Sequence, residues 1–190
     1  YARQGEYGKA EELYEKSIRI CERVLGKEHP DTAGSYNNLA GVYARQGEYG
    51  KAEELYEKSI CIRERVLGKE HPNIEASYNN LAGVYESQGE YEKAKELYEK
   101  SIRIREKVLG EEHFDTAVSY HNLAVVYIKQ GKYEKVLTYL LKVYKIFIYK
   151  FGVKDPYTQI IYENMKIAYS EWNPEGNFRQ WIDKKMKELS

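Results

Sequence analysis

Apolar side chains recur at helical spacing along almost the whole chain. Residues 31–47 carry one stripe in which apolar residues stand three or four positions apart, at Tyr36, Leu39, Ala40 and Tyr43. A second stripe runs from about Glu48 to Leu67, with apolar-face positions at Tyr49, Ala52, Leu55, Tyr56, Ser59, Ile60, Ile62 and Val66. No segment shows the period-two alternation between turn residues that is typical of a strand. The pattern therefore predicts an all-α protein built from helix pairs.

Glycine and proline mark the ends of these helices. Gly47 follows the first stripe and Gly68 follows the second, and glycine adopts the left-handed conformation that closes a helix without steric cost. Pro72 opens the next unit, because proline cannot continue a preceding helix. We expect Asp31 or Thr32 to cap the first helix, since a short side-chain oxygen can accept from the free N–H groups of the first turn.

The same two-helix unit returns with a period of 42 residues. Residues 1–42 and 43–84 differ at six positions, so 36 of 42 pairs match. The copying continues with drift, and one tyrosine position recurs as Tyr1, Tyr43, Tyr85, Tyr127 and Tyr169. One helix pair cannot bury both of its faces, so a fixed period of this length predicts a solenoid in which stacked neighbours complete the core.

The period divides the chain into a single array of repeats. Residues 1–30 form a partial repeat that is mainly a second helix, and full repeats follow at 31–72, 73–114 and 115–156. Residues 157–190 form a divergent last repeat, whose shortened second helix is expected to cap the array.

Both ends of the array are candidate surfaces for association. Tyr1 matches Tyr43, so the chain starts inside a repeat, and we expect the first long helix to expose a face that contacts a second copy. Near the other end Leu141, Phe147, Ile148 and Tyr149 occupy positions that are charged in an earlier copy, at Glu57, Arg63, Glu64 and Arg65. Either the terminal helix covers this apolar face, or the face is a patch for a dimer or another partner.

Composition narrows the function classes. The 30 basic and 30 acidic residues give a net charge of zero, which disfavours broad binding to nucleic acid or to anionic lipid. No signal peptide or membrane-spanning apolar run is recognisable, so no membrane association is expected. Cys21 and Cys61 form no paired motif, which is typical of free thiols in a reducing cytosol, and we expect a cytoplasmic protein.

No catalytic or cofactor-binding motif is recognisable. His29, His71 and His113 recur once per repeat in the connecting loops, and residues one period apart lie on neighbouring units, too far apart for one metal shell. Carboxylates alternate with lysines at helical spacing, as on solvated helix faces. We expect no enzyme activity, no metal site and no cofactor.

The spacing Tyr36-x2-Leu39-Ala40-x2-Tyr43, followed by Ala52-x3-Tyr56, resembles the tetratricopeptide motif, with tyrosine for tryptophan and alanine for glycine. The usual period is about 34 residues, and the extra residues here fall in a longer second helix and its loop. This form, with its LGKEHPDT connector, resembles the repeats of kinesin light chains and nephrocystin-3-like proteins. The resemblance implies a right-handed superhelical solenoid of antiparallel helix pairs, whose first helices line a concave groove that binds a peptide or protein.

The resemblance also implies a ligand-binding role for one asparagine of each first helix. The position is unchanged in four copies, at Asn38, Asn80, Asn122 and Asn164. An asparagine amide both donates and accepts, so this ladder can bind the backbone of an extended peptide, although it can equally bond a neighbouring helix. Two further rows complete the candidate site: Asn37, Asn79 and His121 beside the ladder, and Arg3, Arg45 and Lys129 one turn away, where they can pair with acidic side chains.

Three function classes follow from this reading. A scaffold that binds a peptide or protein segment is favoured, and an assembly module that dimerises through apolar end faces is the alternative. Nucleic-acid binding is disfavoured by the neutral charge and by the lack of groove aromatics for base stacking. A clamp for the C-terminal carboxylate of a chaperone is not expected, because the positions where that clamp is basic hold Gly34, Ala76, Val118 and Ile160.

Overall fold

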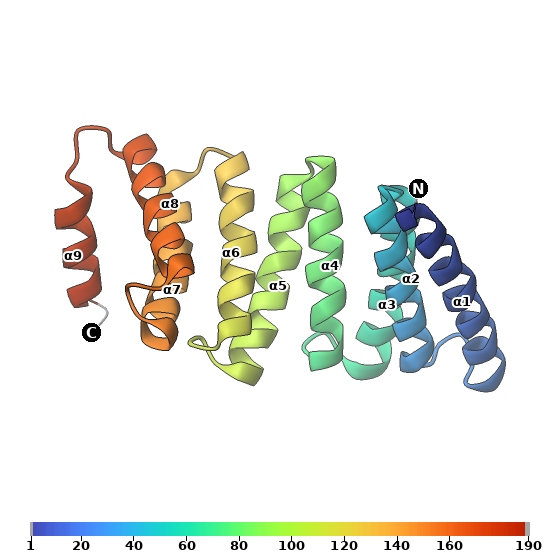
Figure 1. Ribbon diagram of the computed structural model, residues 1–190. Coiled ribbons are helices and arrows are strands. Elements are labelled where there is room, and N and C mark those ends of the chain that lie inside the picture. Colours follow the sequence, from blue (N-terminus) through green and yellow to red (C-terminus); the bar gives the residue numbers. More distant parts are fainter. Residues whose placement is uncertain (1, 189–190) are drawn as a thin grey trace. The chain divides into compact units, whose positions relative to one another are not determined.

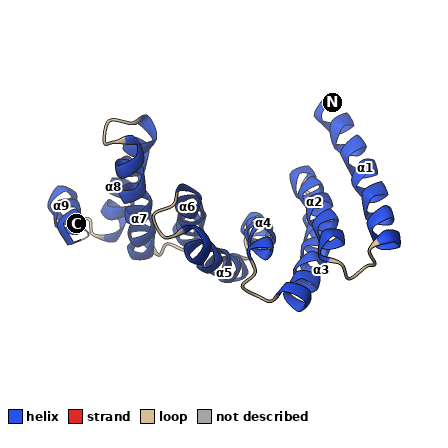
Figure 2. Ribbon diagram, turned by 90° about the horizontal axis from the view of Figure 1, so that it is seen from below, coloured by secondary structure: helices blue, strands red, loops and turns tan. Residues whose placement is uncertain are grey.

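The computed structural model describes the backbone of residues 2–188 and the side chains of residues 7–188, and every regular element in that part is an α-helix (Figures 1 and 2). The elements are α1 (Ala2–Val24), α2 (Pro30–Gln46), α3 (Tyr49–Leu67), α4 (Pro72–Gln88), α5 (Tyr91–Leu109), α6 (Phe114–Lys129), α7 (Tyr133–Phe151), α8 (Pro156–Trp172) and α9 (Phe178–Glu188). They form two compact units, Tyr1–Ile104 and Arg105–Ser190. The predicted all-α architecture is confirmed. Tyr1 of the recurring tyrosine row lies outside the described residues.

Glycine closes α2 as predicted, and it closes α4 in the same way, whereas the C-caps of α6 and α8 are Gln130 and Asn173. Gly47 has a φ of 79° and donates its N–H to the carbonyl of Ala44 at 3.1 Å, while the N–H of Glu48 donates to the carbonyl of Tyr43 at 2.9 Å. These two bonds satisfy the last turn of α2 around a residue in the left-handed conformation. A side chain at this position would strain the backbone, because L residues other than glycine rarely adopt it.

The N-terminal caps differ from the prediction. His29, and not Asp31 or Thr32, is the N-cap of α2, and its Nδ1 accepts from the N–H of Asp31 at 3.2 Å. His71 and His113 cap α4 and α6 in the same way. The Thr32 hydroxyl instead donates to the carbonyl of Gly26 at 2.9 Å, which ties the loop to the helix. The recurring histidines therefore hold the helix starts.

In the first unit each helix packs against the next one along the chain, from α1 to α4 (Figure 1). Small and aromatic side chains make the contact between them, with Ala33, Tyr36 and Ile62 buried together and Ile18 and Leu55 packed against them. Val66, which the pattern assigned to the apolar face, is half exposed in the last turn of α3. The rest of the second stripe is buried or partly buried, so the repeat pattern places the core correctly.

Three of the first helices, α2, α4 and α6, carry a tyrosine that connects the helix to the helices on both sides. The hydroxyl of Tyr78 donates to Oε1 of Glu64 at 2.5 Å, and the Nζ of Lys100 lies 5.4 Å from the centroid of its ring. Glu64 belongs to α3 and Lys100 to α5, so Tyr78 on α4 contacts both neighbours. We call this triple a tyrosine bridge, and it recurs as Glu22–Tyr36–Lys58 and Glu106–Tyr120–Lys142.

A second tyrosine bridge lies two turns further along the first helices. The Tyr85 hydroxyl donates to Glu53 at 2.9 Å, and Lys93 lies 4.8 Å from the centroid of its ring. Tyr43 has the same neighbours in Glu11 and Lys51. A phenylalanine would fill the space but could not bond the carboxylate, so tyrosine is required for the bond in each bridge. A hydrogen bond to a charged group contributes about 1.5–3 kcal/mol.

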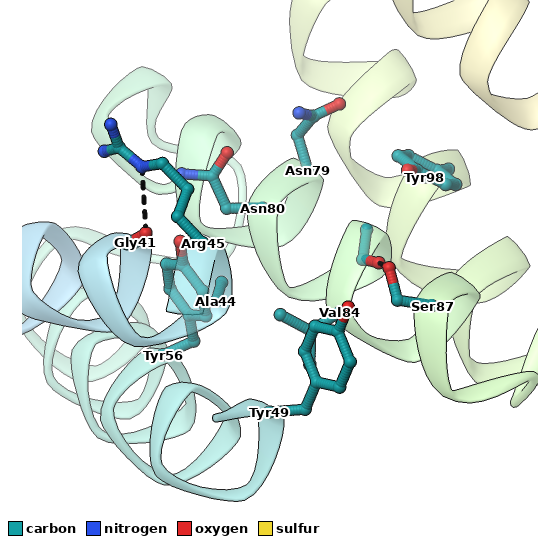
Figure 3. A pocket seen from close by; sticks show the side chains of 11 residues that line it. Gly41, Ala44, Arg45, Tyr49, Tyr56, Asn79, Asn80, Val84, Ser87 and Tyr98 are labelled. Atoms are coloured by element: carbon teal, nitrogen blue, oxygen red, sulfur yellow. Dashed lines mark hydrogen bonds between the residues drawn. The ribbon is translucent and has the colours of Figure 1, made fainter. Parts of the chain in front are cut away.

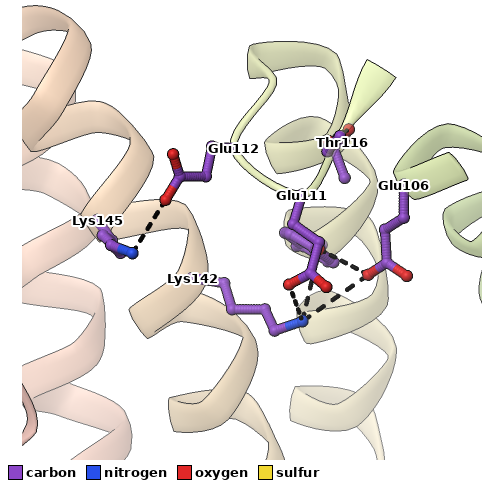
Figure 4. Close-up of polar contacts among 8 residues, drawn as sticks. Glu106, Glu111, Glu112, Thr116, Lys142 and Lys145 are labelled. Carbon is purple, nitrogen blue, oxygen red and sulfur yellow. Dashed lines mark hydrogen bonds and ion pairs between the residues drawn. The ribbon is translucent and has the colours of Figure 1, made fainter. Parts of the chain in front are cut away.

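In the second unit, two lysines of α7 lie close to glutamates at the end of α5 and in the loop that follows it (Figure 4). Lys142 Nζ lies 3.8 Å from Glu106 and 3.6 Å from Glu111, and Lys145 Nζ lies 3.0 Å from Glu112. These contacts hold the end of α5 and its following loop against α7. Exposed ion pairs contribute little by themselves, so buried packing between α6, α7 and α8 carries most of the stability of this unit.

The last repeat replaces bridges with aromatic packing. The ring of Tyr169 on α8 lies 5.5 Å from that of Phe178 and 5.4 Å from that of Trp181, both on α9, and Ile182 of α9 is buried. The carboxylate that would accept from Tyr169, at the position of Glu53 in the first unit, is Leu137 here. The last repeat therefore lacks the carboxylate acceptor, and Tyr169 instead packs in the aromatic cluster that holds α9 against α8.

The apolar face near the C-terminus, at Leu141 and residues 147–149, is partly covered, as one of the two predictions had it, and partly exposed, as the other had it. Leu141 is 8% exposed and lines a cavity together with Trp181 of α9, whereas Phe147 packs on the ring of Phe114 at 5.4 Å. Tyr149 is 92% exposed. The terminal helix therefore covers one end of this face and leaves Tyr149 in solvent.

Candidate functional site

The candidate residues of the first unit lie on two first helices, α2 and α4. Asn38 and Asn80 are exposed, and among the described residues neither side chain has a hydrogen-bond partner. Asn37 is partly buried, and its Oδ1 accepts from the hydroxyl of Ser77 at 2.9 Å. The structure therefore uses the oxygen of Asn37 to join α2 to α4, while the amides of Asn38 and Asn80 face solvent.

Three of the predicted residues line one pocket of about 370 Å³ (Figure 3). Arg45 comes from α2, and Asn79 and Asn80 come from α4. Ser87, Gly41 and Gly83 complete the walls that the first helices provide, and Tyr49, Tyr56 and Tyr98 reach in from the second helices. Asn38 does not line this pocket. The two asparagines and the arginine that the repeat pattern singled out thus share one cavity.

The pocket is lined by polar side chains, and Arg45 is the charged residue among those that line it. The Arg45 Nε donates to the carbonyl of Gly41 at 3.0 Å, and no described carboxylate forms an ion pair with its guanidinium. Burial raises the pKa of the Tyr56 hydroxyl, and the charge of Arg45 opposes that rise. Burial and then Glu86 raise the pKa of Tyr98, whose hydroxyl donates to Glu86 at 3.1 Å. Both hydroxyls therefore stay protonated at neutral pH beside the positive charge of Arg45.

Glycine allows two tyrosine hydroxyls to reach the pocket. A Cβ at Gly41 would lie 3.3 Å from the Tyr56 hydroxyl oxygen, and one at Gly83 would lie 3.6 Å from that of Tyr98. The room that these glycines leave is therefore partly taken by the hydroxyls themselves. In the second unit the matching positions hold Val125 and the exposed Ile167, so the same part of α6 and α8 is apolar.

The candidates of the second unit are separated. His121 of α6 and Asn164 of α8 are exposed and line a second, smaller pocket of about 220 Å³. Asn122 is partly buried, and Lys129 is exposed near the end of α6, and neither lines that pocket. The side chain of Arg3 lies outside the described residues.

Sequence reasoning missed the side chains that second helices contribute to the first pocket. Tyr56 stands at a predicted apolar-face position and Tyr98 follows it one period later; both are buried, but both also line the cavity. Tyr49 has the same double role from the start of α3. Their signal was present in the sequence, because a tyrosine that recurs at a core position has a hydroxyl that must reach an edge.

Neither a metal site nor a membrane-spanning helix is found in the described part of the chain. Among residues 7–188 no three His, Cys, Asp or Glu side chains are grouped so that they could hold a metal ion. Within residues 2–188 no helix combines the length and the apolar character needed to cross a bilayer.

Stacked helix pairs with a polar pocket on their first helices define a helical-repeat protein. A family model described as Tetratricopeptide repeat matches residues 1–65, 31–107 and 73–148. These matches span most of the chain, so the chain belongs to the tetratricopeptide repeat family. Domains of this family are generally protein-interaction modules and are typically not enzymes.

Solved structures agree with this assignment. The nearly identical tetratricopeptide-like repeats of a kinesin light chain-like protein from Podosopora anserina match with a TM-score of 0.79 and 28% identity, over 100% of this chain and 88% of that one. A variant of those repeats matches with a TM-score of 0.78 and 28% identity, over 100% and 87% of the two chains. BtubC (BKLC) from P. vanneervenii matches with a TM-score of 0.81 and 25% identity, over 99% and 74%. No curated protein matches the chain. The predicted kinesin light chain-like tetratricopeptide fold is confirmed.

Proposed function

We propose that this chain is a non-enzymatic scaffold that binds an extended peptide segment of a partner protein along its first helices. The observation that carries the proposal is the pocket in which Arg45, Asn79 and Asn80 meet. Family membership supports a protein partner in general, and the pocket supports the choice of these residues as the proposed site.

The pocket suits a peptide main chain with an acidic side chain. The exposed amide of Asn80 can donate to a peptide carbonyl and accept from a peptide N–H, so it binds the backbone whatever the sequence. The guanidinium of Arg45 lacks a carboxylate partner among the described residues, and guanidinium binds carboxylate with two parallel hydrogen bonds. The tyrosine hydroxyls can serve the remaining polar atoms of a ligand. A segment with an aspartate or glutamate beside a backbone contact fits this arrangement.

The test begins with peptides selected from a random display library on the intact chain. The best binder is then titrated into wild type and into the variants Arg45→Gln and Asn80→Ala. We expect each variant to weaken binding about tenfold, since a charge-assisted or bidentate contact is lost. Both residues are exposed, so the melting temperature should stay within a few degrees of wild type.

Lys129→Gln is the matched control. Lys129 occupies the position of Arg45 two repeats later, is also exposed, and lines neither the pocket at Arg45 nor the pocket at Asn164. Loss of binding in Arg45→Gln with retention in Lys129→Gln supports the proposal. Equal affinities in all variants would overturn the proposed site.

Assembly through the C-terminal apolar face is a second candidate function. Tyr149 is 92% exposed, and Phe151 and Val153 beside it are also exposed. Sedimentation over a range of concentrations separates the two functions. A mass that doubles with concentration, and that stays single in Tyr149→Ser, would favour assembly over peptide binding by a single chain.

A further inference from the structure

The N-terminal halves of the first helices differ between the two units: a polar network lies between α2 and α4, and an apolar pocket lies at the equivalent positions of α6 and α8. In the first unit, Arg63 of α3 reaches between the N-terminal halves of α2 and α4. Its Nη1 donates to the carbonyl of Asn73 at 2.5 Å and to the hydroxyl of Ser77 at 3.0 Å. Its Nη2 lies 3.3 Å from where a Cβ would stand at Gly34. Ser77 in turn donates to Asn37, so a polar network fills the space.

In the second unit every member of that network is changed. Two periods later, Phe147 stands in the place of Arg63, Ile161 in that of Ser77, His121 in that of Asn37, Val118 in that of Gly34, and Tyr157 in that of Asn73. The side chains that bonded one another are gone, and the side chains that replace them are mostly apolar. The change affects all contacts of one site together, on three different helices.

The result is an open apolar pocket of about 220 Å³ between α6 and α8. Val118, Phe147 and Ile161 line it, and Ile160 and Tyr157 stand at the rim with 55% and 70% of their surfaces exposed. Asn164 also lines it, and its exposed amide belongs to the candidate ladder. An apolar cavity therefore adjoins an amide that can bind a peptide backbone.

Size and charge define the occupant. A cavity of about 150 Å³ lined by leucine, isoleucine and phenylalanine binds benzene, so this pocket has room for a whole aromatic ring. None of the described residues that line it is Asp, Glu, Lys or Arg, and a charged side chain that entered would lose water without gaining a partner of permanent opposite charge, since His121 and Asn164 are the polar side chains besides Tyr157 in the lining. A ring would also meet the rings of Phe147 and Tyr157. The pocket is thus complementary to a neutral aromatic side chain and not to an acidic or basic one.

We propose that this pocket is a specificity site that binds one aromatic side chain of an extended partner segment, whose main chain bonds to Asn164. The proposal rests on the proposed peptide-binding function and adds the side-chain class that the second unit selects. Within each unit the first helices then select differently: the pocket at Arg45 takes an acidic side chain, and the pocket at Phe147 takes an aromatic one.

The first test uses N-acetyl-phenylalaninamide as a probe, with N-acetyl-glutamine amide as its polar control. Methyl-labelled protein is titrated with each compound and followed by NMR. We expect saturable shifts of the methyl groups of Val118, Ile160 and Ile161 with the phenylalanine probe only. Absence of shifts, or equal shifts with the glutamine compound, would overturn the proposal. This test is independent of whether a longer peptide binds elsewhere.

The second test compares Ile160→Glu with Ala76→Glu, its matched control at the equivalent exposed position of α4. Ile160→Glu should weaken binding of the phenylalanine probe at least about tenfold, because a carboxylate at the rim must lose water when the ring enters. Ala76→Glu should leave it unchanged. Ile160→Ser, which adds no charge, serves if the glutamate variant lowers the melting temperature. Retained probe binding in both Ile160 variants would overturn the site.

Display-selected peptides distinguish this inference from the proposed function. Peptides that depend on Arg45 but contain no preferred aromatic residue and tolerate Ile160→Glu would overturn the inference and leave the function standing. Peptides with one enriched aromatic residue, whose binding is lost on Ile160→Glu, support both. If no peptide binds, the function fails, and the phenylalanine probe alone decides the pocket.

Discussion

At the scale of single residues, the tyrosines of the first helices act as links between repeats. Each ring is buried while its hydroxyl donates to a glutamate of the preceding second helix and its face meets a lysine of the following one. Such a residue joins three helices with one side chain. The repeats therefore depend on hydrogen bonds to carboxylates as well as on apolar burial.

Replacing Tyr78 by phenylalanine tests these links. Tyr78→Phe removes the 2.5 Å bond to Glu64 and leaves the ring in place, so the free energy of unfolding should fall by about 1.5–3 kcal/mol. Tyr149→Phe is the control, because Tyr149 is exposed and should change stability by less than about 0.5 kcal/mol. Urea unfolding of both variants measures the difference. Equal stabilities would show that the hydroxyl contributes nothing.

Alkaline pH should weaken the same links. Burial, followed by the nearby glutamates, raises the pKa of Tyr43 to about 12 and also raises the pKa values of Tyr36, Tyr78, Tyr85 and Tyr120. Tyrosine in the unfolded chain ionises near pH 10, so the folded state favours the neutral phenol. The stabilisation is complete below about pH 10 and is lost as the pH rises towards 12 and above.

Urea midpoints measured across this range, together with tyrosinate absorbance, check the prediction. We expect the midpoint to fall steeply above about pH 10, with most tyrosinate appearing only as the chain unfolds. Ionisation of all tyrosines near pH 10 in the still-folded chain would contradict it.

At the scale of elements, the helix ends show what the sequence could and could not reveal. The C-terminal ends of the first helices were predictable, because only glycine readily adopts the left-handed conformation that Gly47 shows at a φ of 79°. The N-terminal caps were not, because histidine is not among the usual capping residues, and only its placed Nδ1 reveals the bond to Asp31. For α2, the residue type alone therefore predicts the C-terminal end, whereas the N-terminal cap can be recognised only from the three-dimensional structure.

Two neighbouring glycines should respond in opposite directions to alanine. Gly47→Ala should lower the free energy of unfolding by about 1 kcal/mol, because alanine is strained at a positive φ. Gly50→Ala should raise it by a few tenths to about 1 kcal/mol, because Gly50 lies in α3, where nothing within 4 Å opposes a Cβ. Thermal unfolding of the two variants compares them directly. Equal destabilisation by both would contradict the assigned conformations.

The candidate site was predictable only in part, for a similar reason. Asn80 and Arg45 could be named from the period, because first helices face the groove in this family. Their grouping with Tyr56 and Tyr98 could not, because these tyrosines come from second helices and their hydroxyls meet the first helices beside Gly41 and Gly83. The substitutions that remove the Arg63 network from the second unit are visible in the sequence one by one. The cavity is recognisable only when α6, α7 and α8 are placed together in the structure.

At the scale of the whole molecule, near-identical repeats present different surfaces. The first unit offers a polar pocket with the Arg45 cation, and the second offers an apolar pocket beside Asn164. The repeats share a framework of bridges and caps, and substitutions on first and second helices make the two pockets differ. Under the proposed function, specificity in this chain would depend on which repeats have diverged.

NMR mapping of one display-selected peptide shows whether the first helices form the binding surface. On titration with that peptide, we expect the largest amide shifts at Gly41 of α2 and at Asn80 and Gly83 of α4, the residues around the polar pocket. The exposed face of α3 at Glu54 and Lys58 should remain unshifted. Shifts concentrated on that second-helix face, with none at Asn80, would rule out binding along the first helices.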